Sequence, residues 1–288
     1  MNSPVVLRTP QEIARWRAAG SLGLVPTMGA LHEGHASLIR RAAAECDAVI
    51  VSIFVNPTQF NDPADLERYP RPFERDVTVA GEHGAAAIYA PDVETMYPAG
   101  HATTIHVAGV TERWEGEHRP GHFDGVATVV SILLNQVRPD RSYFGEKDWQ
   151  QLAMIRRMAA DLSLPGEIIG CPLIRDDDGL ALSSRNVRLS PEEREAALVI
   201  PSSLMRIRDR VAAGERSVAS LLDVGHGVLR TRPEVAVEYL AIVDPDSLEP
   251  LETIDHAARA LVAARAGHTR LIDTMDLSAQ HSDAAPRS

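Results

Sequence analysis

The sequence predicts an α/β fold with a doubly wound parallel sheet, followed by a smaller α+β domain. Short apolar runs alternate with amphipathic helical stretches up to about residue 175. The runs are rich in β-branched residues, which is typical of parallel strands buried on both faces. Beyond residue 175 the alternation stops, and a length of 288 residues is enough for two domains.

The first domain is expected over residues 1–175. Its first helix begins with the motif Thr-Pro-Gln-Glu at residues 9–12, which has the form of a capping box, and ends near Ala19. Strands are expected at residues 22–26, 48–55, 86–90, 141–144 and 167–170, and further helices at 34–46, 73–83, 123–137 and 149–162. This alternation predicts parallel strands joined by right-handed crossovers, as in Rossmann-like domains.

The second domain is expected over residues 176–277. The polar residues 176–179 lead into it and are interpreted only as a solvated turn. The motif Ser-Pro-Glu-Glu at residues 190–193 is a second capping box and predicts one long helix to about Ala212. A helix at 218–230 and strands at 235–243, 260–266 and 269–275 follow, and residues 278–288 are expected to be a polar tail.

Composition and charge exclude several classes of protein. Hydrophobic residues make up 44% of the chain and charged residues 24%, as in ordinary folded proteins. The formal net charge of −11 has the wrong sign for a protein that binds nucleic acid by neutralising phosphates. No apolar run reaches the roughly 18 residues of a membrane helix, and the N-terminus lacks the apolar core of a signal peptide. We therefore expect neither a nucleic-acid partner nor a membrane partner.

The cysteine content indicates a reducing compartment. Cys46 and Cys171 are too few for a disulfide framework or a four-thiolate metal site, so we expect a cytoplasmic protein. Neither cysteine has a local base, and both are interpreted as buried small residues.

The first group of candidate functional residues lies where the strand at 22–26 leads into the next helix. It comprises Pro26, Thr27, Met28, Gly29, Ala30, Leu31, His32, Glu33, Gly34 and His35. Doubly wound folds bind their ligands at such junctions, and a helix start offers unpaired backbone N–H groups to phosphate. Two imidazoles there would stabilise negative charge on a phosphorus. The alternatives are a polar surface turn or a metal pair; zinc fits poorly, because the spacing is not His-Glu-x-x-His and no third ligand is evident.

A second group, Gly145, Glu146, Lys147 and Asp148, follows the strand at 141–144. It therefore lies at the same edge of the predicted sheet as the first group. Lys147 could bridge two phosphates, and Asp148 could accept a hydrogen bond from a ribose hydroxyl or cap the next helix. The alternative interpretation is a solvated loop.

A third group, Leu182, Ser183, Ser184, Arg185 and Asn186, lies close to the predicted domain boundary. Two hydroxyls and a guanidinium in a mobile loop could close over a triphosphate. The alternative is a polar hinge between the domains.

Four segments together identify a resemblance. They are Pro-Thr-Met-Gly-Ala-Leu-His-Glu-Gly-His at 26–35, Phe-Val-Asn-Pro at 54–57 with Gln-Phe at 59–60, Phe-Gly-Glu-Lys-Asp at 144–148 with Gln-Gln-Leu at 150–152, and Asp-Gly-Leu-Ala at 178–181 with Ser-Ser-Arg-Asn at 183–186. Their order over residues 23–277 resembles the pantothenate synthetase (pantoate–β-alanine ligase) family of the His-x-Gly-His nucleotidyltransferases. The resemblance implies that pantoate attacks the α-phosphorus of ATP to give pantoyl adenylate and pyrophosphate. The amine of β-alanine then displaces AMP.

The resemblance also implies roles for single residues. His35 takes the position of the family's proton donor, and His32 lies beside it on the phosphates. Gln59 and Gln151 match the glutamines that bind pantoate, with Gln59 also next to the β-alanine path. ATP is assigned to residues 26–35, to Gly145, Glu146, Lys147 and Asp148, to Ile174 on the adenine side, and to Leu182, Ser183, Ser184 and Arg185. By resemblance, Mg²⁺ travels with the triphosphate and the chain forms a homodimer through its first domain.

Two departures and two rival functions remain. Leu182 stands where the family usually has Met, a nearly volume-conserving change that should cost little. Ala36 stands where Leu is common, so the packing behind that helix is expected to be thinner. A different nucleotidyltransferase with a phosphorylated acceptor is one rival, but such an acceptor calls for Arg or Lys rather than Gln59 and Gln151. The other is a nucleotide-binding module without catalysis, which the complete set of phosphate contacts disfavours.

Overall fold

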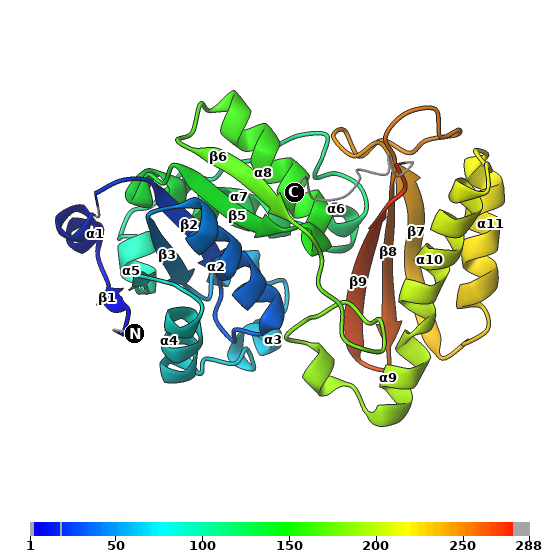
Figure 1. The fold of residues 1–288 in the computed structure, drawn as a ribbon, viewed down its shortest axis with the longest axis horizontal. Helices are drawn as coiled ribbons and strands as arrows, with labels where there is room; N and C mark the ends of the chain where they lie inside the picture. Colours follow the sequence, from blue (N-terminus) through cyan, green and yellow to red (C-terminus); the bar gives the residue numbers. More distant parts are fainter. Residues whose placement is uncertain (1–2, 18, 279–288) are drawn as a thin grey trace, which may run out of the picture. The chain divides into compact units, whose positions relative to one another are not determined.

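The computed structural model describes residues 3–17 and 19–278. The predicted polar tail therefore lies, apart from residue 278, outside the described residues. Two compact units make up the chain (Figure 1): Met1–Ile174 with Leu182–Ser184, and Arg175–Ala181 with Arg185–Ser288.

A six-stranded parallel sheet forms the centre of the first unit. Its strands are β1 (Val5–Leu7), β2 (Leu22–Thr27), β3 (Ala48–Ile53), β4 (Ala87–Tyr89), β5 (Arg141–Gly145) and β6 (Glu167–Cys171). Their order in the sheet is β1-β4-β3-β2-β5-β6, and every pair is parallel. The predicted fold class is thus confirmed. The edge strand β1 was not predicted, because three residues are too few to show a period; β2 is consequently the second strand of the chain and not the first.

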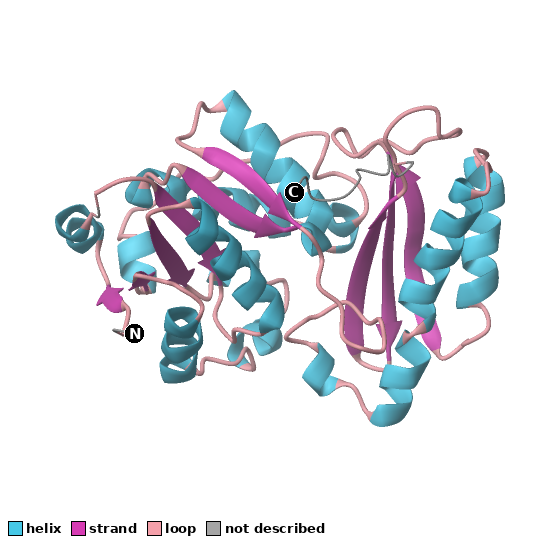
Figure 2. Ribbon diagram, viewed as in Figure 1, coloured by secondary structure: helices cyan, strands magenta, loops and turns pink. Residues whose placement is uncertain are grey.

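Helices cover both faces of this sheet (Figure 2). The main ones are α1 (Pro10–Trp16), α2 (Glu33–Glu45), α4 (Phe73–Glu82), α7 (His122–Val137) and α8 (Trp149–Asp161). Val25 and Tyr143 pack in one core cluster with residues of α2 and α4. On the opposite face, Tyr89 donates a hydrogen bond to Gln136 of α7 at 2.6 Å. The strands are buried between the two layers, as their continuous apolar runs predicted.

Some short elements were not predicted from the sequence. These are α3 (Pro63–Glu67), α5 (Val93–Met96), α6 (Glu115–His118) and the 3₁₀ turns η1 (Pro57–Gln59), η2 (Glu146–Asp148) and η3 (Asn186–Arg188). The first helix is also shorter than expected, because Arg17 already leaves helical geometry with ψ of 115°. Its cap is only half of the expected box: Thr9 accepts from the Glu12 N–H, but the Glu12 carboxylate accepts from the Arg8 N–H instead of that of Thr9.

The second unit contains a three-stranded antiparallel sheet with helices packed against it (Figure 1). Its elements are α9 (Pro191–Ala197), α10 (Val199–Ala212), α11 (Val218–Leu229), β7 (Val235–Val243), β8 (Arg259–Ala266) and β9 (Thr269–Asp276). The capping box of Ser190 and Glu193 is confirmed. The prediction of one long helix was wrong, because the helix is interrupted at Leu198, where α9 ends and α10 begins. Pro201 has no N–H to donate to the carbonyl of Ala197, so it can only stand in the first turn of a new helix.

The acidic residues at 176–178 are more than a solvated turn. Arg194 of α9 donates to Asp176 at 2.6 Å and to Asp178 at 2.8 Å. The neighbouring Arg175 makes a two-pronged contact with the buried carboxylate of Asp273 on β9, at 2.6 and 3.0 Å. Charge-assisted pairs of this geometry fix the segment 175–181 to the core of the second unit.

The close approach of α7 to η1 leads to a first prediction. A Cβ on Gly125 would lie 2.6 Å from the Thr58 carbonyl oxygen, which belongs to the backbone and cannot move aside cheaply. Gly125→Ala should therefore lower the free energy of unfolding by about 1–3 kcal/mol. Gly227→Ala in α11 is the matched control, because a Cβ there meets nothing within 4 Å and should stabilise the helix by roughly 0.5–1 kcal/mol. Chemical denaturation measures both, and equal effects at the two positions would contradict the packing described here.

Candidate active site

The chain makes a tight turn between β2 and α2. Gly29 has a φ of 80° and Ala30 a φ of 51°, so two successive residues are in the left-handed region. For alanine this conformation costs about 1–2 kcal/mol and persists only where the surroundings impose it. The Thr27 hydroxyl supports the turn by accepting from the Gly29 N–H at 3.1 Å.

Two histidines close the start of α2. His32 is the N-cap, and its Nδ1 accepts a hydrogen bond from the Gly34 N–H at 3.1 Å. The Nδ1 of His35 accepts in return from the His32 N–H at 3.3 Å. The two rings lie 4.1 Å apart. They form a reciprocal capping box in which imidazoles take the places of the usual serine and glutamate.

This capping fixes the protonation of both rings. A backbone N–H can only donate, so each Nδ1 is an unprotonated acceptor and the ring hydrogen lies on Nε2. Burial lowers the pKa of His35 to about 3, and the nearby His32 and Lys147 add to the effect, because a second positive charge beside them is unfavourable. His35 is therefore a neutral N–H donor at physiological pH.

Gly34 makes room for the His32 ring. A Cβ at position 34 would lie 2.9 Å from Cε1 and 3.0 Å from Nδ1 of His32. The glycine in the His-x-Gly-His motif is thus needed for the first histidine to fold back over the helix.

The expected row of free backbone N–H groups at this helix start is not observed. The protein itself accepts from the N–H groups of Gly29, Ala30, Leu31, His32, Gly34 and His35. In both rings the hydrogen lies on Nε2, the nitrogen that does not cap the helix.

Lys147 lies at the same edge of the sheet. β5 neighbours β2 in parallel, so the residues after Thr27 and after Gly145 leave the sheet together. Lys147 is in the turn η2, its side chain is 18% exposed, and its Nζ is 3.8 Å from the exposed carboxylate of Asp148. Its charge acts on the pKa of His35, as described above. The site thus combines a cation with neutral N–H donors, which suits a developing phosphate charge.

Gln59 is held by a buried polar network. Its Nε2 donates to the Met28 sulfur at 3.3 Å, and its Oε1 accepts from Asn56 at 3.0 Å. The Gln59 carbonyl accepts from Nδ1–H of His122 at 2.9 Å. Burial and the charge of Arg119 lower the pKa of His122 to about 4, so this ring is also neutral, with its hydrogen on Nδ1.

No role was predicted from the sequence for Asn56 or His122. Asn56 also donates to the Gly125 carbonyl at 3.1 Å and accepts from the Tyr97 hydroxyl at 2.8 Å. A signal for both was present, since the apolar run at 48–55 leads directly into Asn56 and His122 begins a helix that is otherwise strongly apolar. A polar side chain in such a setting is usually retained for its hydrogen bonds.

The two adjacent glutamines of α8 differ in their surroundings. Gln150 is buried, and its amide donates to the carbonyls of Val110 and Arg113 and accepts from the Glu115 N–H. Gln151 is partly buried, and within the described part of the chain its amide has no hydrogen-bond partner. Gln151 is therefore the one of the pair that can bind a ligand.

The remaining predicted residues lie in the segment that follows Ala181 and, in the case of Glu33, on α2. Leu182 donates its N–H to the Ile174 carbonyl at 3.0 Å, and its Cβ is 3.9 Å from the Cβ position of Gly34. Ser183 and Ser184 continue this segment of the first unit, whereas Arg185 belongs to the second unit. The exposed Glu33 forms an ion pair with Arg40, which lowers the pKa of Glu33, so its carboxylate is engaged on the surface of α2.

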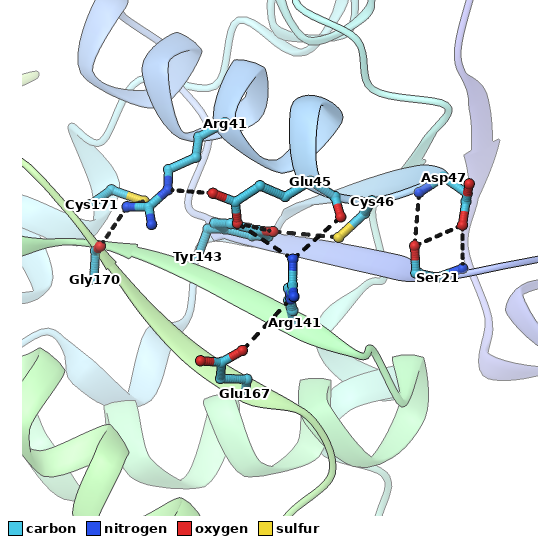
Figure 3. A network of polar contacts seen from close by, with 10 residues as sticks. All are labelled: Ser21, Arg41, Glu45, Cys46, Asp47, Arg141, Tyr143, Glu167, Gly170 and Cys171. Atoms are coloured by element: carbon cyan, nitrogen blue, oxygen red, sulfur yellow. Dashed lines mark hydrogen bonds and ion pairs between the residues drawn. The ribbon is translucent and has the colours of Figure 1, made fainter. Parts of the chain in front are cut away.

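A polar network anchors α2 behind the histidines (Figure 3). Arg41 donates to the Gly170 carbonyl of β6 at 2.8 Å and to Glu45 at 3.0 Å. Burial raises the pKa of Tyr143, so its phenol keeps the proton that it donates to Glu45 at 3.0 Å. Cys171 is buried as expected, whereas Cys46 is only partly buried, 3.4 Å from the Tyr143 hydroxyl. The helix that carries His32 and His35 is thereby fixed to β5 and β6.

Neither a metal-binding cluster nor a membrane-spanning helix is found in the part of the chain that the structure describes. The described residues contain no group of three or more His, Cys, Asp or Glu side chains that could hold a metal ion. In residues 3–17 and 19–278, no helix has the length and apolar character needed to span a membrane.

The chain is similar to known proteins in both sequence and structure. A family model described as pantoate-beta-alanine ligase matches residues 5–276. The pantothenate synthetase of Deinococcus radiodurans is 53% identical over 265 residues, which cover 90% of this chain and 94% of the relative. The crystal structure of pantothenate synthetase from Thermus thermophilus superposes with a TM-score of 0.91 at 47% identity, covering 95% of this chain and 99% of the other.

A third similar protein was solved with ligands. The pantoate-beta-alanine ligase of Francisella tularensis, complexed with beta-gamma ATP and beta-alanine, has a TM-score of 0.79 and 33% identity. The match covers 95% of this chain and 98% of that one.

Burial predicts how His35 and His122 titrate, and their hydrogen bonds predict the tautomers. His35 should stay neutral down to about pH 4 with its hydrogen on Nε2, and His122 should stay neutral down to about pH 4 to 5 with its hydrogen on Nδ1. His256 is the internal control, because its hydrogen bond with Asp255 raises its pKa above 6.5. Two-bond ¹H–¹⁵N spectra report both tautomer and titration. A midpoint near 6.5 for His35 would contradict the capping box.

The same shifts have a consequence for stability. Both folded-state pKa values lie below the unfolded value of about 6.5, so the unfolded chain binds more protons between these limits. The contribution of the two neutral rings to the free energy of unfolding is therefore complete above about pH 6.5. It is lost as the pH falls toward 4 and 3.

Proposed function

The chain belongs to the pantoate–β-alanine ligase family, and from this membership we propose that its site joins pantoate to β-alanine through an adenylate. The observation that carries the proposal is the pair of neutral, backbone-capped histidines next to Lys147 at the carboxyl edge of β2 and β5. Family membership disfavours both rivals, a different nucleotidyltransferase and a module without catalysis.

In the first step, a carboxylate oxygen of pantoate attacks the α-phosphorus of ATP. The bond from this phosphorus to the bridging oxygen breaks, and pyrophosphate leaves. We propose that Lys147 and the Nε2–H groups of His32 and His35 stabilise the negative charge that develops on the phosphates. We keep for His35 the position of the proton donor that the resemblance implies, and its Nε2–H is the hydrogen that we propose it presents to the phosphates.

In the second step, the free amine of β-alanine attacks the acyl carbon of pantoyl adenylate, loses a proton and releases AMP. We assign pantoate to Gln59 and Gln151. Gln59 is held in place by Asn56, while Gln151 has its amide available. Two primary amides can bind a hydroxy acid without a fixed charge that would weaken its carboxylate as a nucleophile.

The other nucleotide contacts are proposed from the resemblance. They are residues 26–35, Gly145, Glu146 and Asp148, Ile174, Leu182, Ser183, Ser184 and Arg185. We propose that Mg²⁺ enters with ATP, bound by phosphate oxygens and water, which are ligands that this ion prefers to a protein cage.

Assembly and location also rest on the resemblance. We propose a homodimer formed through the first unit and a cytoplasmic location, in keeping with two free cysteines. Light scattering at micromolar concentration should then give twice the chain mass of 31.3 kDa. A value of 31.3 kDa would contradict the dimer.

The two-step scheme predicts separable half-reactions. The protein should exchange labelled pyrophosphate into ATP when pantoate is present and β-alanine is absent, and should form AMP at a steady rate only when both are present. Lys147→Ala should lose pyrophosphate exchange by about 10²-fold to 10³-fold, because one preorganised donor to the phosphates is removed. The same variant should convert supplied pantoyl adenylate and β-alanine to product with much less impairment.

Two outcomes would count against this scheme. Wild-type protein that makes no AMP under any combination of pantoate, β-alanine and ATP would contradict the proposed function. Equal losses in both half-reactions of Lys147→Ala would show that this residue organises the whole site rather than the phosphates.

A further inference from the structure

One buried carboxylate stands outside every role assigned so far. Asp76 lies on α4, on the face where Phe73, Val77 and Ala80 pack into the core of the first unit. Its exposed fraction is 1%. At this spacing a helix would ordinarily place an apolar side chain, so the carboxylate is retained there for the bonds it makes.

Both oxygens of Asp76 bind the turn between β2 and α2. Oδ2 accepts from the Ala30 N–H and Oδ1 from the Leu31 N–H, each at 2.8 Å. A Cβ on Gly29 would lie 2.8 Å from Oδ2, so the glycine admits the carboxylate as well as the positive φ. One side chain therefore satisfies two successive N–H donors in a concave turn, as bound anions do.

These bonds account for the strained alanine. Ala30 has a φ of 51°, a region that alanine leaves when it is free to do so. The carboxylate holds the N–H groups of residues 30 and 31 in one orientation and so imposes the left-handed conformation. Released from Asp76, the turn would relax toward conformations with negative φ.

The turn is connected to both halves of the proposed site. On one side Met28 contacts the amide of Gln59, and on the other His32 caps α2. A shift of the turn would therefore move the residues that the proposed function assigns to ATP and the first histidine together.

We propose that Asp76 is a positioning residue for ATP binding: from α4 it holds the Gly29–Leu31 turn, and through the turn His32, in the binding geometry. This inference rests on the proposed function, which assigns the turn to ATP. Asp76 touches backbone and no substrate, so it acts through the residues that it places.

The central test is Asp76→Asn. The amide keeps the shape of the side chain, but its NH₂ group would face one of the two N–H donors. The Kd for ATP, measured by calorimetry on the full-length variant, should rise by about tenfold to hundredfold. Hydrogen exchange of the Ala30 and Leu31 amides should accelerate, while exchange in the body of α2 stays slow.

The matched control is Asp47→Asn. Asp47 also accepts from a backbone N–H, that of Ser21 at 2.8 Å, but at the amino edge of the sheet (Figure 3). The substitution removes the same chemical group far along β2 from the turn, so the ATP affinity of this variant should stay within about twofold of wild type.

A second variant separates positioning from general stability. Ala30→Gly removes the penalty for positive φ, so in the double variant with Asp76→Asn it should recover about threefold to tenfold of the lost ATP affinity. A folded Asp76→Asn protein with wild-type ATP affinity would overturn the proposal, as would a double variant that recovers nothing.

Hydrogen exchange on the wild-type protein decides the case if Asp76→Asn does not fold. Slow exchange at Ala30 and Leu31 supports the clamp, and exchange as fast as in an open loop overturns it. Wild-type protein that binds no ATP would contradict the proposed function instead, and the exchange result would still judge the role of Asp76 in the turn.

Discussion

The first N–H groups of α2 need hydrogen-bond acceptors, and under the proposed function the residues that supply these acceptors also meet the nucleotide. In most helices a serine or aspartate satisfies the first N–H groups. Here two imidazoles do so through Nδ1, which places the hydrogen of each ring on Nε2. Under the proposed function, capping and ligand recognition are thus assigned to opposite sides of the same rings. The tight turn before the helix, the glycine at position 34 and the burial of His35 all follow from this requirement.

Neutral histidines divide the electrostatic work with Lys147. A protonated His35 beside this lysine would place two positive charges in a partly buried site, and the structure avoids this by holding the ring neutral. The fixed positive charge then comes from the lysine, while the imidazoles supply direction. This arrangement suits phosphoryl chemistry, in which charge spreads over several oxygens and donors must be placed in advance.

Several buried polar side chains around the site form hydrogen bonds that connect segments distant in sequence. Asn56, Gln150 and His122 each bind main-chain atoms of a segment distant in sequence, and each is almost fully buried. A buried polar group is costly unless all its bonds are made, so such residues allow one arrangement of the backbone and penalise others. The loops that carry Gln59 and residues 110–115 are fixed in this way as well as by apolar packing, such as that of the buried Val110.

The order of residues along the chain was enough to predict the parallel α/β fold, the small α+β domain and the grouping of residues 26–35 with Lys147 at one edge of the sheet. These depend on periodicity, local caps and strand order, all of which are local signals. The same signals could not predict β1, the break at Leu198, the ion pairs of Asp176 and Asp178, or the tautomers of His32 and His35. These depend on which donor lies opposite which acceptor, and long-range packing brings such partners together. Asp76 shows the difference most clearly: on the helix it is one acidic residue among several, and only the folded chain places both its oxygens against the N–H groups of Ala30 and Leu31.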